Sequence, residues 1–514
     1  MFSSKYYYEQ YPDVRTSKYP AIVHFIGKGW KEGRNPSRYF DTSFYLQSNS
    51  DVKNAGINPL VHYIRHGKRE GRLPFDGAVT PSAPMGDGVP MPEWIVTEMR
   101  NMSSEIYPEM TPSQIKLATY HNYKHPINKK PGEVYRGFLK KCSGTAYTHC
   151  FALPWLKRGG ADYVALLHVR FAAGLPEGKV LVILTEPGDS PWLERLPSGV
   201  DVIDVSKELK RMTETEMVQV LARLLLQLDI QTLHIINSRL VWEVVKNYGN
   251  AVRNKTKIFA SVFCDDYDRY GEPVGYARTY LPVCYRLLTN VFCDNSSFPA
   301  LLRKTYGYPE ELFRVLHSPI ASVSFAERKA PSKKVLWAGR LDRQKRPDIL
   351  LKIVEKLPDV QFDVYGEPLL ESPKNVISQL KKQKNVDMKG SFNGVEALGF
   401  EDYALFLYTS QWDGIPTMVI AAALAGIPVV ASAVGGVGEV ISGDRGYPVA
   451  DYENSDKYVE AVRMILSDRK TAEAKAGKAL EYVMTVHTED RFGGELLNTP
   501  GYVAPSQKQP SGER

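Results

Sequence analysis

The hydrophobic positions of the chain change their spacing regularly from about residue 147 onward, where strand patterns and helix patterns alternate. Short runs of consecutive apolar residues, bounded by Gly, Pro or polar residues, predict buried strands. Apolar residues three or four positions apart predict helices between them. The strands predicted here are 151–153, 180–185, 200–203, 232–238 and 257–263, and the helices are 162–172 and 217–228. This alternation predicts an α/β fold with a parallel sheet.

A second α/β unit begins at residue 334, so the chain is expected to contain two Rossmann-like domains. Its apolar runs and helical spacings follow the same rules as those of the first unit. An Ala-rich segment near residue 421 suits a helix packed closely on a sheet, with Thr417 as a possible cap. The strands predicted in this unit are 334–339, 360–365 and 429–432, and the helices are 347–357 and 417–424.

An internal repeat with a constant offset of 38 residues covers the first 74 residues. Aromatic pairs, Asp-Val and His-aromatic dipeptides predict short helices packed as hairpins, which makes this segment an α-helical repeat module. The repeated segments are Tyr6-Tyr7 with Phe44-Tyr45, Asp13-Val14 with Asp51-Val52, His24-Phe25 with His62-Tyr63, and Glu32-Gly33-Arg34 with Glu70-Gly71-Arg72.

Two interpretations of this repeat remain open. In the first it is a packing module in which His24 and His62 are hydrogen-bonded interior residues. In the second, its cations form a basic face for anionic lipid or an acidic glycan. The cations of that face are Lys28, Lys31, Arg34, Arg65, Lys68, Arg69 and Arg72.

These patterns divide the chain into five segments. A linker rich in Pro, Gly and small residues follows the repeat at 75–92, and its composition marks a boundary. The polar end of the tail suggests disorder over the last ten residues. The expected segments are a repeat module at 1–74, a linker with lead-in helices at 75–140, an N-terminal Rossmann-like domain at 141–325, a C-terminal Rossmann-like domain at 326–475, and a last helix with tail at 476–514.

Composition narrows the class of protein. With 43% hydrophobic and 24% charged residues, the chain is expected to be a soluble globular protein. The net charge of +7 fits an anionic nucleotide-sugar or a membrane surface, but it is too small to indicate nucleic acid. Five cysteines without Cys-x-x-Cys spacing suggest a reducing compartment. Gly426 and Pro428 interrupt the most apolar run, so we expect a cytoplasmic protein without a spanning segment, with peripheral contact at the inner face of the membrane as an option.

The stretch from Trp412 to Glu439 has the features of an anion-binding cradle. A tight turn, Asp413 to Pro416, precedes the N-terminus of the Ala-rich helix, and a Gly435-Gly436 pair opens a second loop. Backbone N–H groups at such a turn would supply donors, and the helix dipole favours negative charge.

The same stretch resembles the donor-sugar site of family 4 glycosyltransferases, which are retaining enzymes of the GT-B fold. That resemblance implies two domains that face each other across a cleft, with an acceptor domain at 141–325 and a donor-binding domain at 326–475. It also implies a closing helix near 467–486. It assigns Asp413 to the acidic group facing the sugar and backbone groups of the donor-binding turn to sugar or phosphate oxygens. The family's second Glu corresponds to Ala421, so its usual contact with the ribose must come from elsewhere or be absent. The turn residues concerned are Gly414, Ile415, Pro416 and Thr417.

A second match to the family lies at Gly339-Arg340 and Lys345. The resemblance implies that Arg340 and Lys345 bind the donor diphosphate. Fixed cations would stabilise the negative charge that develops on a leaving nucleoside diphosphate. Solvated loop charges are the alternative.

The acceptor domain offers weaker candidates. Gly159 and Gly160 resemble the family's first Gly-rich loop, which approaches the nucleotide phosphate or the acceptor. At the end of the fifth strand, where the family often has a His, the chain has Asp265 and Asp266. These carboxylates could guide the acceptor proton, and a Mg²⁺ or Mn²⁺ site is a weaker alternative, so no metal ligand is assigned. His234 and Asn237 form a candidate acceptor rim or a structural hydrogen-bonding pair.

The resemblance, together with an N-terminal repeat like that attached to bacterial surface-polysaccharide glycosyltransferases, implies a metal-independent hexosyltransferase. It would use a nucleotide-diphosphate sugar as co-substrate, without a further cofactor, and a glycan or lipid-linked glycan as acceptor. A front-face route with retained anomeric configuration fits the absence of a well-placed nucleophile. Two alternatives come from other classes: a catalytically weak GT-B scaffold that binds a glycan or partner, and a membrane-surface adaptor.

Overall fold

The structure is a computed structural model whose described residues group into two compact units. The first unit combines 1–141 with 208–220, and the second combines 142–207 with 221–514. Most of the linker expected at 75–92 and most of the disordered tail expected over the last ten residues lie outside the described part of the chain. The structure describes residues 1–15, 19–75, 93–105, 130–142, 144–208, 212–320, 332–368 and 373–505.

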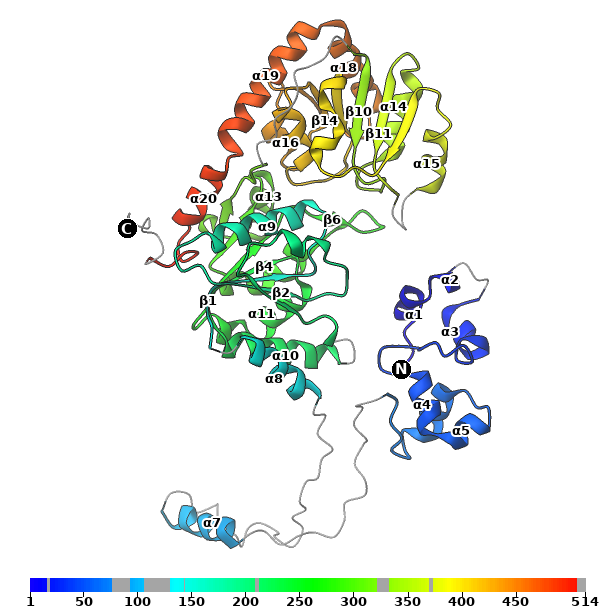
Figure 1. The fold of residues 1–514 in the computed structure, drawn as a ribbon, viewed down its shortest axis with the longest axis vertical. Coiled ribbons are helices and arrows are strands. Elements are labelled where there is room, and N and C mark those ends of the chain that lie inside the picture. The colour runs from blue at the N-terminus through cyan, green and yellow to red at the C-terminus, as the bar shows by residue number, and fades with distance from the viewer. Residues whose placement is uncertain are drawn as a thin grey trace. The chain divides into compact units, whose positions relative to one another are not determined.

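Short helices form the N-terminal part of the first unit, as expected (Figure 1). They surround an aromatic core that includes Tyr7 and Tyr45, both 0% exposed. The Tyr7 hydroxyl lies 3.2 Å from His24 Nδ1, and the Tyr45 hydroxyl lies 2.9 Å from His62 Nδ1. Both histidines therefore serve as hydrogen-bonding partners of core tyrosines.

The helices of this unit include two π-helical turns, η1 and η2. In order they are α1 Ser4–Gln10, α2 Pro12–Arg15, α3 Ala21–His24, η1 Phe25–Gly29, α4 Thr42–Ser48, α5 Ser50–Asn54, α6 Pro59–His62, η2 Tyr63–Gly67, α7 Glu93–Glu105 and α8 Lys130–Cys142.

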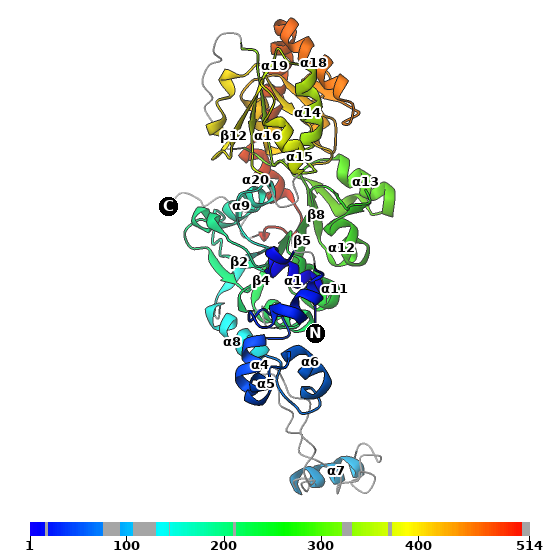
Figure 2. The same ribbon diagram turned by 90° about the vertical axis from the view of Figure 1, so that its right-hand side faces the viewer.

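The second unit contains a seven-stranded parallel sheet in the order β3-β2-β1-β4-β5-β8-β9, as the alternating pattern predicted (Figure 2). All five predicted strands form, with small shifts at their ends. The strands are β1 Ala146–Leu153, β2 Val180–Leu184, β3 Asp201–Asp204, β4 Asp229–Ile236, β5 Lys257–Ser261, β8 Asn290–Cys293 and β9 Phe313–Val315. A separate antiparallel hairpin pairs β6 Asp266–Tyr267 with β7 Pro273–Val274.

Helices connect these strands. Helices α9 and α11 lie on opposite faces of the sheet (Figure 1), as expected where the strand order reverses. The helices are α9 Gly160–Ala173, α10 Glu214–Gln227, α11 Arg239–Val252, α12 Tyr276–Cys284 and α13 Ser297–Tyr306, and the 3₁₀ turns are η6 Pro191–Arg195, η8 Tyr285–Leu287 and η9 Glu310–Leu312.

A six-stranded parallel sheet follows, in the order β12-β11-β10-β13-β14-β15. Successive residues of β10 enter different cores: Val335 and Trp337 pack with α14, whereas Leu336 and Ala338 pack with α16. The sheet is thus buried on both faces, which explains its continuous apolar runs. Its strands are β10 Lys334–Ala338, β11 Gln361–Tyr365, β12 Val386–Gly390, β13 Leu405–Tyr408, β14 Val429–Ser432 and β15 Tyr447–Val449.

The predicted helices of this sheet also form. The helices are α14 Pro347–Lys356, α15 Lys374–Leu380, α16 Thr417–Leu424, α17 Val437–Val440 and α18 Ser455–Ser467, with 3₁₀ turns η10 Val395–Leu398 and η11 Phe400–Asp402. The cap prediction was wrong: Pro416 occupies the N-cap position, Thr417 is the first helical residue, and no side chain caps the helix.

The C-terminal helices connect the cores of the two sheets. Helix α19, Arg469–Val486, packs its Ala479 and Val483 against α16, and α20, Glu489–Asn498, packs Phe492 against the seven-stranded sheet (Figure 1). The predicted closing helix is therefore present. No described helix is both long enough and apolar enough to cross a membrane.

Candidate active site

The order of the six-stranded sheet reverses between β10 and β13, and ligands of open α/β sheets bind outside the strand ends at such a point. The loop 339–346 follows β10, and the loop 409–416 follows β13. Thr409 connects the two loops, because its hydroxyl accepts from Trp337 Nε1 at 3.0 Å and donates to the Lys345 carbonyl oxygen at 2.8 Å. This topology brings together both motifs that the sequence singled out.

Lys345, Asp413 and Tyr408 form one hydrogen-bonded group at this point. Lys345 Nζ and the Tyr408 hydroxyl both contact Asp413 Oδ2, and Lys345 Nζ lies 2.9 Å from the Tyr408 hydroxyl. The Lys345 side chain is 15% exposed and that of Asp413 is 19% exposed. The group therefore presents a partly screened cation–carboxylate pair instead of an isolated cation. Tyr408 was not predicted; its position as the last residue of an apolar strand is the only sequence signal for it.

Arg340 lies closer to solvent, with a side chain that is 57% exposed. Its guanidinium contacts Asp342 at 3.3 Å and donates to Gln344 Oε1 at 2.5 Å. The Lys345 side chain packs beside Gly339, where a Cβ would make ordinary contact at 3.5 Å from Lys345 Cγ. Arg340 is thus an exposed cation of this loop, as is Arg343, whereas Lys345 is more buried.

Not all four residues of the predicted donor-binding turn, Gly414 to Thr417, have a backbone N–H group available for a ligand. Pro416 has no N–H, Gly414 N donates to its neighbour's carboxylate at 3.1 Å, and Ile415 N donates to Asp294 Oδ2 at 2.9 Å. Of the four turn residues, Thr417 at the start of α16 is the one whose N–H has no acceptor recorded among the described residues. Two of the expected donors are therefore engaged by carboxylates of the protein.

Asp294 is a site residue that the sequence analysis missed. It follows β8, a strand that was not predicted, and a Cβ at Gly414 would overlap its carboxylate. Burial raises the pKa of Asp294 to about 7, and the charge of Asp413 adds to that rise. Asn295 Nδ2 donates to Asp294 Oδ1 at 2.6 Å, which orients the carboxylate. The Asp294 carboxylate, which follows strand β8 of the seven-stranded sheet, thus contacts the turn that precedes α16.

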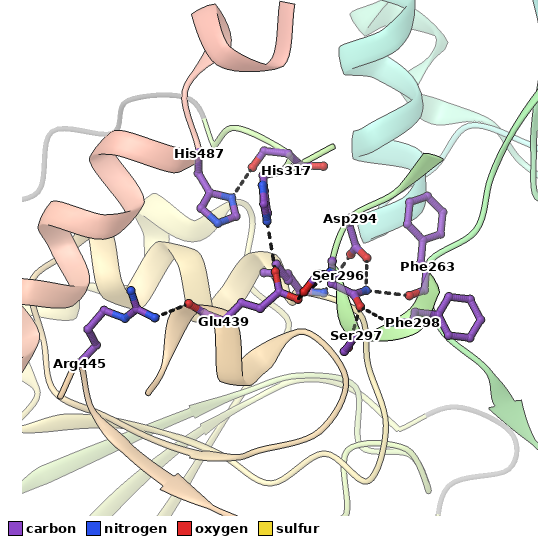
Figure 3. Close-up of polar contacts among 12 residues, drawn as sticks. Phe263, Asp294, Ser296, Ser297, Phe298, His317, Glu439, Arg445 and His487 are labelled. Atoms are coloured by element: carbon purple, nitrogen blue, oxygen red, sulfur yellow. Dashed lines mark hydrogen bonds and ion pairs between the residues drawn. The ribbon is translucent and has the colours of Figure 1, made fainter. Parts of the chain in front are cut away.

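Glu439 makes a second set of contacts between segments that follow the two sheets (Figure 3). Its Oε1 accepts from Ser296 N at 2.7 Å and from the Ser296 hydroxyl at 2.8 Å, and its Oε2 lies 3.2 Å from His317 Nε2. Burial opposes ionisation of Glu439, but the hydrogen bonds from His317 and Ser296 lower its pKa below the ordinary value. Glu439 was left out of the predicted site.

The loop that contains Gly435 and Gly436 packs closely against the turn Asp413 to Pro416. Gly435 has φ 51°, and a Cβ there would overlap the Asp413 carbonyl oxygen. Gly436 N donates to Gly414 O at 3.1 Å. A side chain at residue 435 would be excluded by both strain and contact, so this loop fixes the backbone of the acidic turn.

The acidic residues after β5 have other partners. Both carboxylate oxygens of Asp265 are bound by Arg278, at 2.8 and 2.6 Å, and Asp265 is 5% exposed. This bidentate contact raises the pKa of Arg278. Asp266 begins the β6–β7 hairpin and accepts from Tyr267 N at 2.8 Å. A proton-accepting role for Asp265 would require the Arg278 ion pair to open.

His234 lies in the protein core and not on an exposed rim. It is 0% exposed, its Nε2 lies 2.8 Å from the Ser261 hydroxyl, and its Nδ1 lies 3.0 Å from the Tyr502 hydroxyl. Burial, followed by the nearby His168, lowers its pKa well below the usual value. The structural alternative accounts for His234. Asn237 adopts a left-handed backbone, φ 57°, in the turn between β4 and α11.

Gly159 is the N-cap residue of helix α9, and Gly160 is its first residue. A Cβ on Gly159 would lie 2.7 Å from Asp162 Oδ2, and Asp162 Oδ1 accepts from Lys157 N at 3.1 Å. Because neither glycine has a side chain, the loop backbone at residues 159 and 160 is not covered by side chains of these residues. Ala421, in place of the family's second Glu, is 0% exposed and packs within the core of α16.

The family model for glycosyl transferases group 1 matches residues 323–480. This range contains both loops of the switch point and Glu439. This part of the chain is therefore similar to the group 1 glycosyl transferases, and it is called the group 1 domain below. Among curated relatives, the O-antigen biosynthesis glycosyltransferase WbnH of Escherichia coli is 29% identical over 184 residues, which are 33% of this chain and 53% of WbnH. The chain thus spans about half the length of that relative.

Solved structures show the fold around this group 1 domain. HepE of Anabaena, crystallised with UDP, has a TM-score of 0.54 at 17% identity and covers 68% of this chain and 99% of its own. A glycosyltransferase of Rickettsia africae has a TM-score of 0.54 at 12% identity and covers 69% of this chain and 98% of its own. These likenesses confirm the predicted GT-B fold with two Rossmann-like sheets.

Proposed function

We propose that the protein is a retaining glycosyltransferase that moves a hexose from a nucleotide-diphosphate sugar to a glycan or lipid-linked glycan acceptor in bacterial surface polysaccharide synthesis. The Lys345–Asp413–Tyr408 group at the switch point of a group 1 domain carries the proposal. The name of WbnH, and the UDP bound to HepE, support a nucleotide-sugar and a polysaccharide pathway.

In this proposal each site residue has a distinct role in binding the donor or in its reaction. Arg340, exposed beside the loop, binds the donor diphosphate, and Lys345 adds positive charge as the leaving group develops its own negative charge. Asp413, held by Lys345 and Tyr408, accepts a hydrogen bond from a sugar hydroxyl. The first-turn N–H of Thr417 and the dipole of α16 favour the anionic donor. Gly159 and Gly160 leave room for phosphate or acceptor at the start of α9.

The proton of the attacking hydroxyl goes to the departing phosphate in this scheme. The new glycosidic bond forms on the same face as the bond that breaks, so the anomeric configuration is retained. Asp265 is bound on both oxygens by Arg278, which leaves it without a direct part in this step.

The test is to incubate the purified full chain with a panel of nucleotide-diphosphate sugars and to measure release of free nucleotide diphosphate. Lys345→Ala should reduce release about 100-fold or more. Lys356→Ala is the matched control, because Lys356 pairs with Asp456 on the surface of the same domain. Unchanged release from Lys345→Ala would refute the site, and proton NMR of the product would test retention.

A glycan-binding GT-B scaffold is the second candidate, and Ala421 favours it, since the position of the family's second acid is buried and apolar. A scaffold would still be stabilised against heat by the correct nucleotide-sugar but would release no diphosphate with any acceptor extract. Turnover with any donor excludes it.

We also propose that the N-terminal helices are two copies of one unit. Four consecutive elements, α1 to η1, start 38 residues before their counterparts α4 to η2. The contacts support this: Tyr7 with His24 corresponds to Tyr45 with His62, and Arg34 with Asp13 corresponds to Arg72 with Asp51. Swapping residues 1–38 for a second copy of 39–76 should leave the helix content of the protein unchanged.

A further inference from the structure

The positive charge of the protein is concentrated in its first 75 residues. This segment contains 12 Lys or Arg and six Asp or Glu, so it carries six of the seven net positive charges of the whole chain. The remaining 439 residues are close to neutral. The charge therefore belongs to the repeat module and not to the proposed donor site.

Internal ion pairs use most of the carboxylates of this segment. Arg34 binds Asp13 and Glu32, each at 2.7 Å, and Arg72 binds Asp51 and Glu70 at the same distance. The two arginine side chains are only 19% and 23% exposed. This corrects the basic face predicted from the sequence, because Arg34 and Arg72 are structural cross-links.

Four cations of the predicted face remain for a partner. They lie at exposed positions on or just after the two π-helical turns, and no ion pair to them is recorded within the described part of the chain. With the module's carboxylates mostly bound internally, its exposed cations, these four among them, give it a positive outer charge. The four are Lys31, Arg65, Lys68 and Arg69.

Aliphatic side chains are exposed on the same helical segments. Ile22, Val23 and Ile26 on α3 and η1 are 45%, 49% and 48% exposed, and Ile64 on η2 is 58% exposed. Ile26 and Ile64 are 38 residues apart, at matching positions of the two halves. The aromatic core of the module is complete without them. Both halves therefore expose a β-branched aliphatic side chain next to cations.

We propose that this module docks on the surface of an anionic phospholipid bilayer. Ile22, Val23, Ile26 and Ile64 would enter the boundary between headgroups and acyl chains, and the four cations would contact lipid phosphates. The combination decides the occupant, because an acidic polysaccharide matches the charge but offers no apolar phase for isoleucine. Docking would hold the chain where lipid-linked acceptors are found, although the binding itself does not depend on sugar transfer.

The test is flotation of the full chain with vesicles, without donor or acceptor. Vesicles that contain phosphatidylglycerol should carry the protein, and pure phosphatidylcholine vesicles should not. Ile26→Asp together with Ile64→Asp should weaken binding about tenfold or more, whereas Ile26→Leu together with Ile64→Leu should retain it. Reversing the charge of Lys31, Arg65, Lys68 and Arg69 to Glu should abolish binding.

The matched control is Met464→Asp with Lys356→Glu, which changes an exposed apolar side chain and an exposed lysine in the group 1 domain. Circular dichroism verifies that each variant is folded. Equal binding of the Asp and Leu variants, equal binding to both vesicle types, or retention on an anionic polysaccharide without flotation would each overturn the proposal. None of these outcomes depends on whether the protein transfers a sugar.

Discussion

Asp294 Oδ2 accepts a hydrogen bond of 2.9 Å from the backbone N–H of Ile415, so a carboxylate that follows strand β8 fixes the turn that leads into helix α16. The contact joins segments 121 positions apart in the chain. It engages a backbone donor that the sequence pattern assigned to a ligand. The acidic turn is thus held by the protein on both sides, by Asp294 from one sheet and by Lys345 from the other.

Replacing Asp294 by Asn should remove a pH-dependent contribution to stability. Burial raises the pKa of Asp294 from 3.8 to about 7. The folded state therefore binds this proton more tightly than the unfolded state, and stability decreases as pH rises from about 4 to about 7. Asn keeps an oxygen for Ile415 N–H and loses no proton. Relative to wild type, the variant should gain up to ~4 kcal/mol between these pH values in urea unfolding; a constant difference would contradict this assignment.

Tyr408→Phe should weaken catalysis without unfolding the domain. The substitution removes the hydroxyl that contacts both Lys345 and Asp413 but leaves their ion pair in place. A hydrogen bond to a charged group contributes about 1.5–3 kcal/mol, which predicts a loss of roughly 10- to 100-fold in nucleotide-diphosphate release. Steady-state kinetics with saturating donor would measure it. Tyr270→Phe is the control, because the Tyr270 side chain is 74% exposed.

Ala421→Glu, which restores the family's second acid, should destabilise the protein and not activate it. Ala421 is 0% exposed among apolar side chains of α16 and its neighbours. Burying an unpaired carboxylate costs several kcal/mol, so thermal unfolding should shift down by roughly 10 °C or more. Ala474→Glu on the exposed side of α19 is the control. A stable Ala421→Glu variant with higher activity would show that this position reaches the donor.

Tyr502→Phe should loosen the attachment of the C-terminal segment. The Tyr502 hydroxyl is the partner of His168 Nδ1 at 2.9 Å and of His234 Nδ1 at 3.0 Å. Removing it leaves buried imidazole nitrogens without their partner, at a cost of about 1–3 kcal/mol. Chemical unfolding would measure the loss, and hydrogen exchange should rise selectively in α20. If exchange in α20 does not change, the hydroxyl does not anchor that helix.

Acid should destabilise the protein through the buried histidines of the first sheet. Burial lowers the pKa of His149 to about 4 and that of His168 to about 3. The unfolded chain binds these protons near pH 6.5, so stability present above that value is lost as pH falls. His149→Phe should reduce the loss, because His149 is 1% exposed and its ring stacks on Phe151, so that an apolar ring fits the same position. Exposed His66→Phe should have no effect.

The sequence predicted most of the architecture because both sheets are buried on two faces. Strands such as 429–432 are continuous apolar runs, and this signal does not depend on partners distant in sequence. The loop after β10 was placed correctly for the same reason, whereas β13, Leu405–Tyr408, was not among the predicted strands.

What could not be predicted depends on contacts between distant segments. Asp294 becomes a site residue only because β8 ends beneath a turn far along the chain, and β8 is only four residues long. His234 had two open interpretations, a rim or a structural hydrogen bond, and its contact with Tyr502, 268 positions later in the chain, supports the structural one. The pairing of Arg34 and Arg72 with acidic residues 21 positions earlier was likewise not visible in a run of charges.

The position of Tyr502 has a consequence for synthesis of the protein. Tyr502 and Val503 share a core cluster with Phe259 and Phe292 of the first sheet. A nascent chain emerges from the ribosome N-terminal end first, and domains ordinarily fold in that order. The core of the seven-stranded sheet cannot be completed until residues 502 and 503 have been synthesised. Premature termination after the seven-stranded sheet but before Tyr502 would therefore leave that sheet with an exposed apolar opening, and such fragments should be substrates for chaperones and proteases.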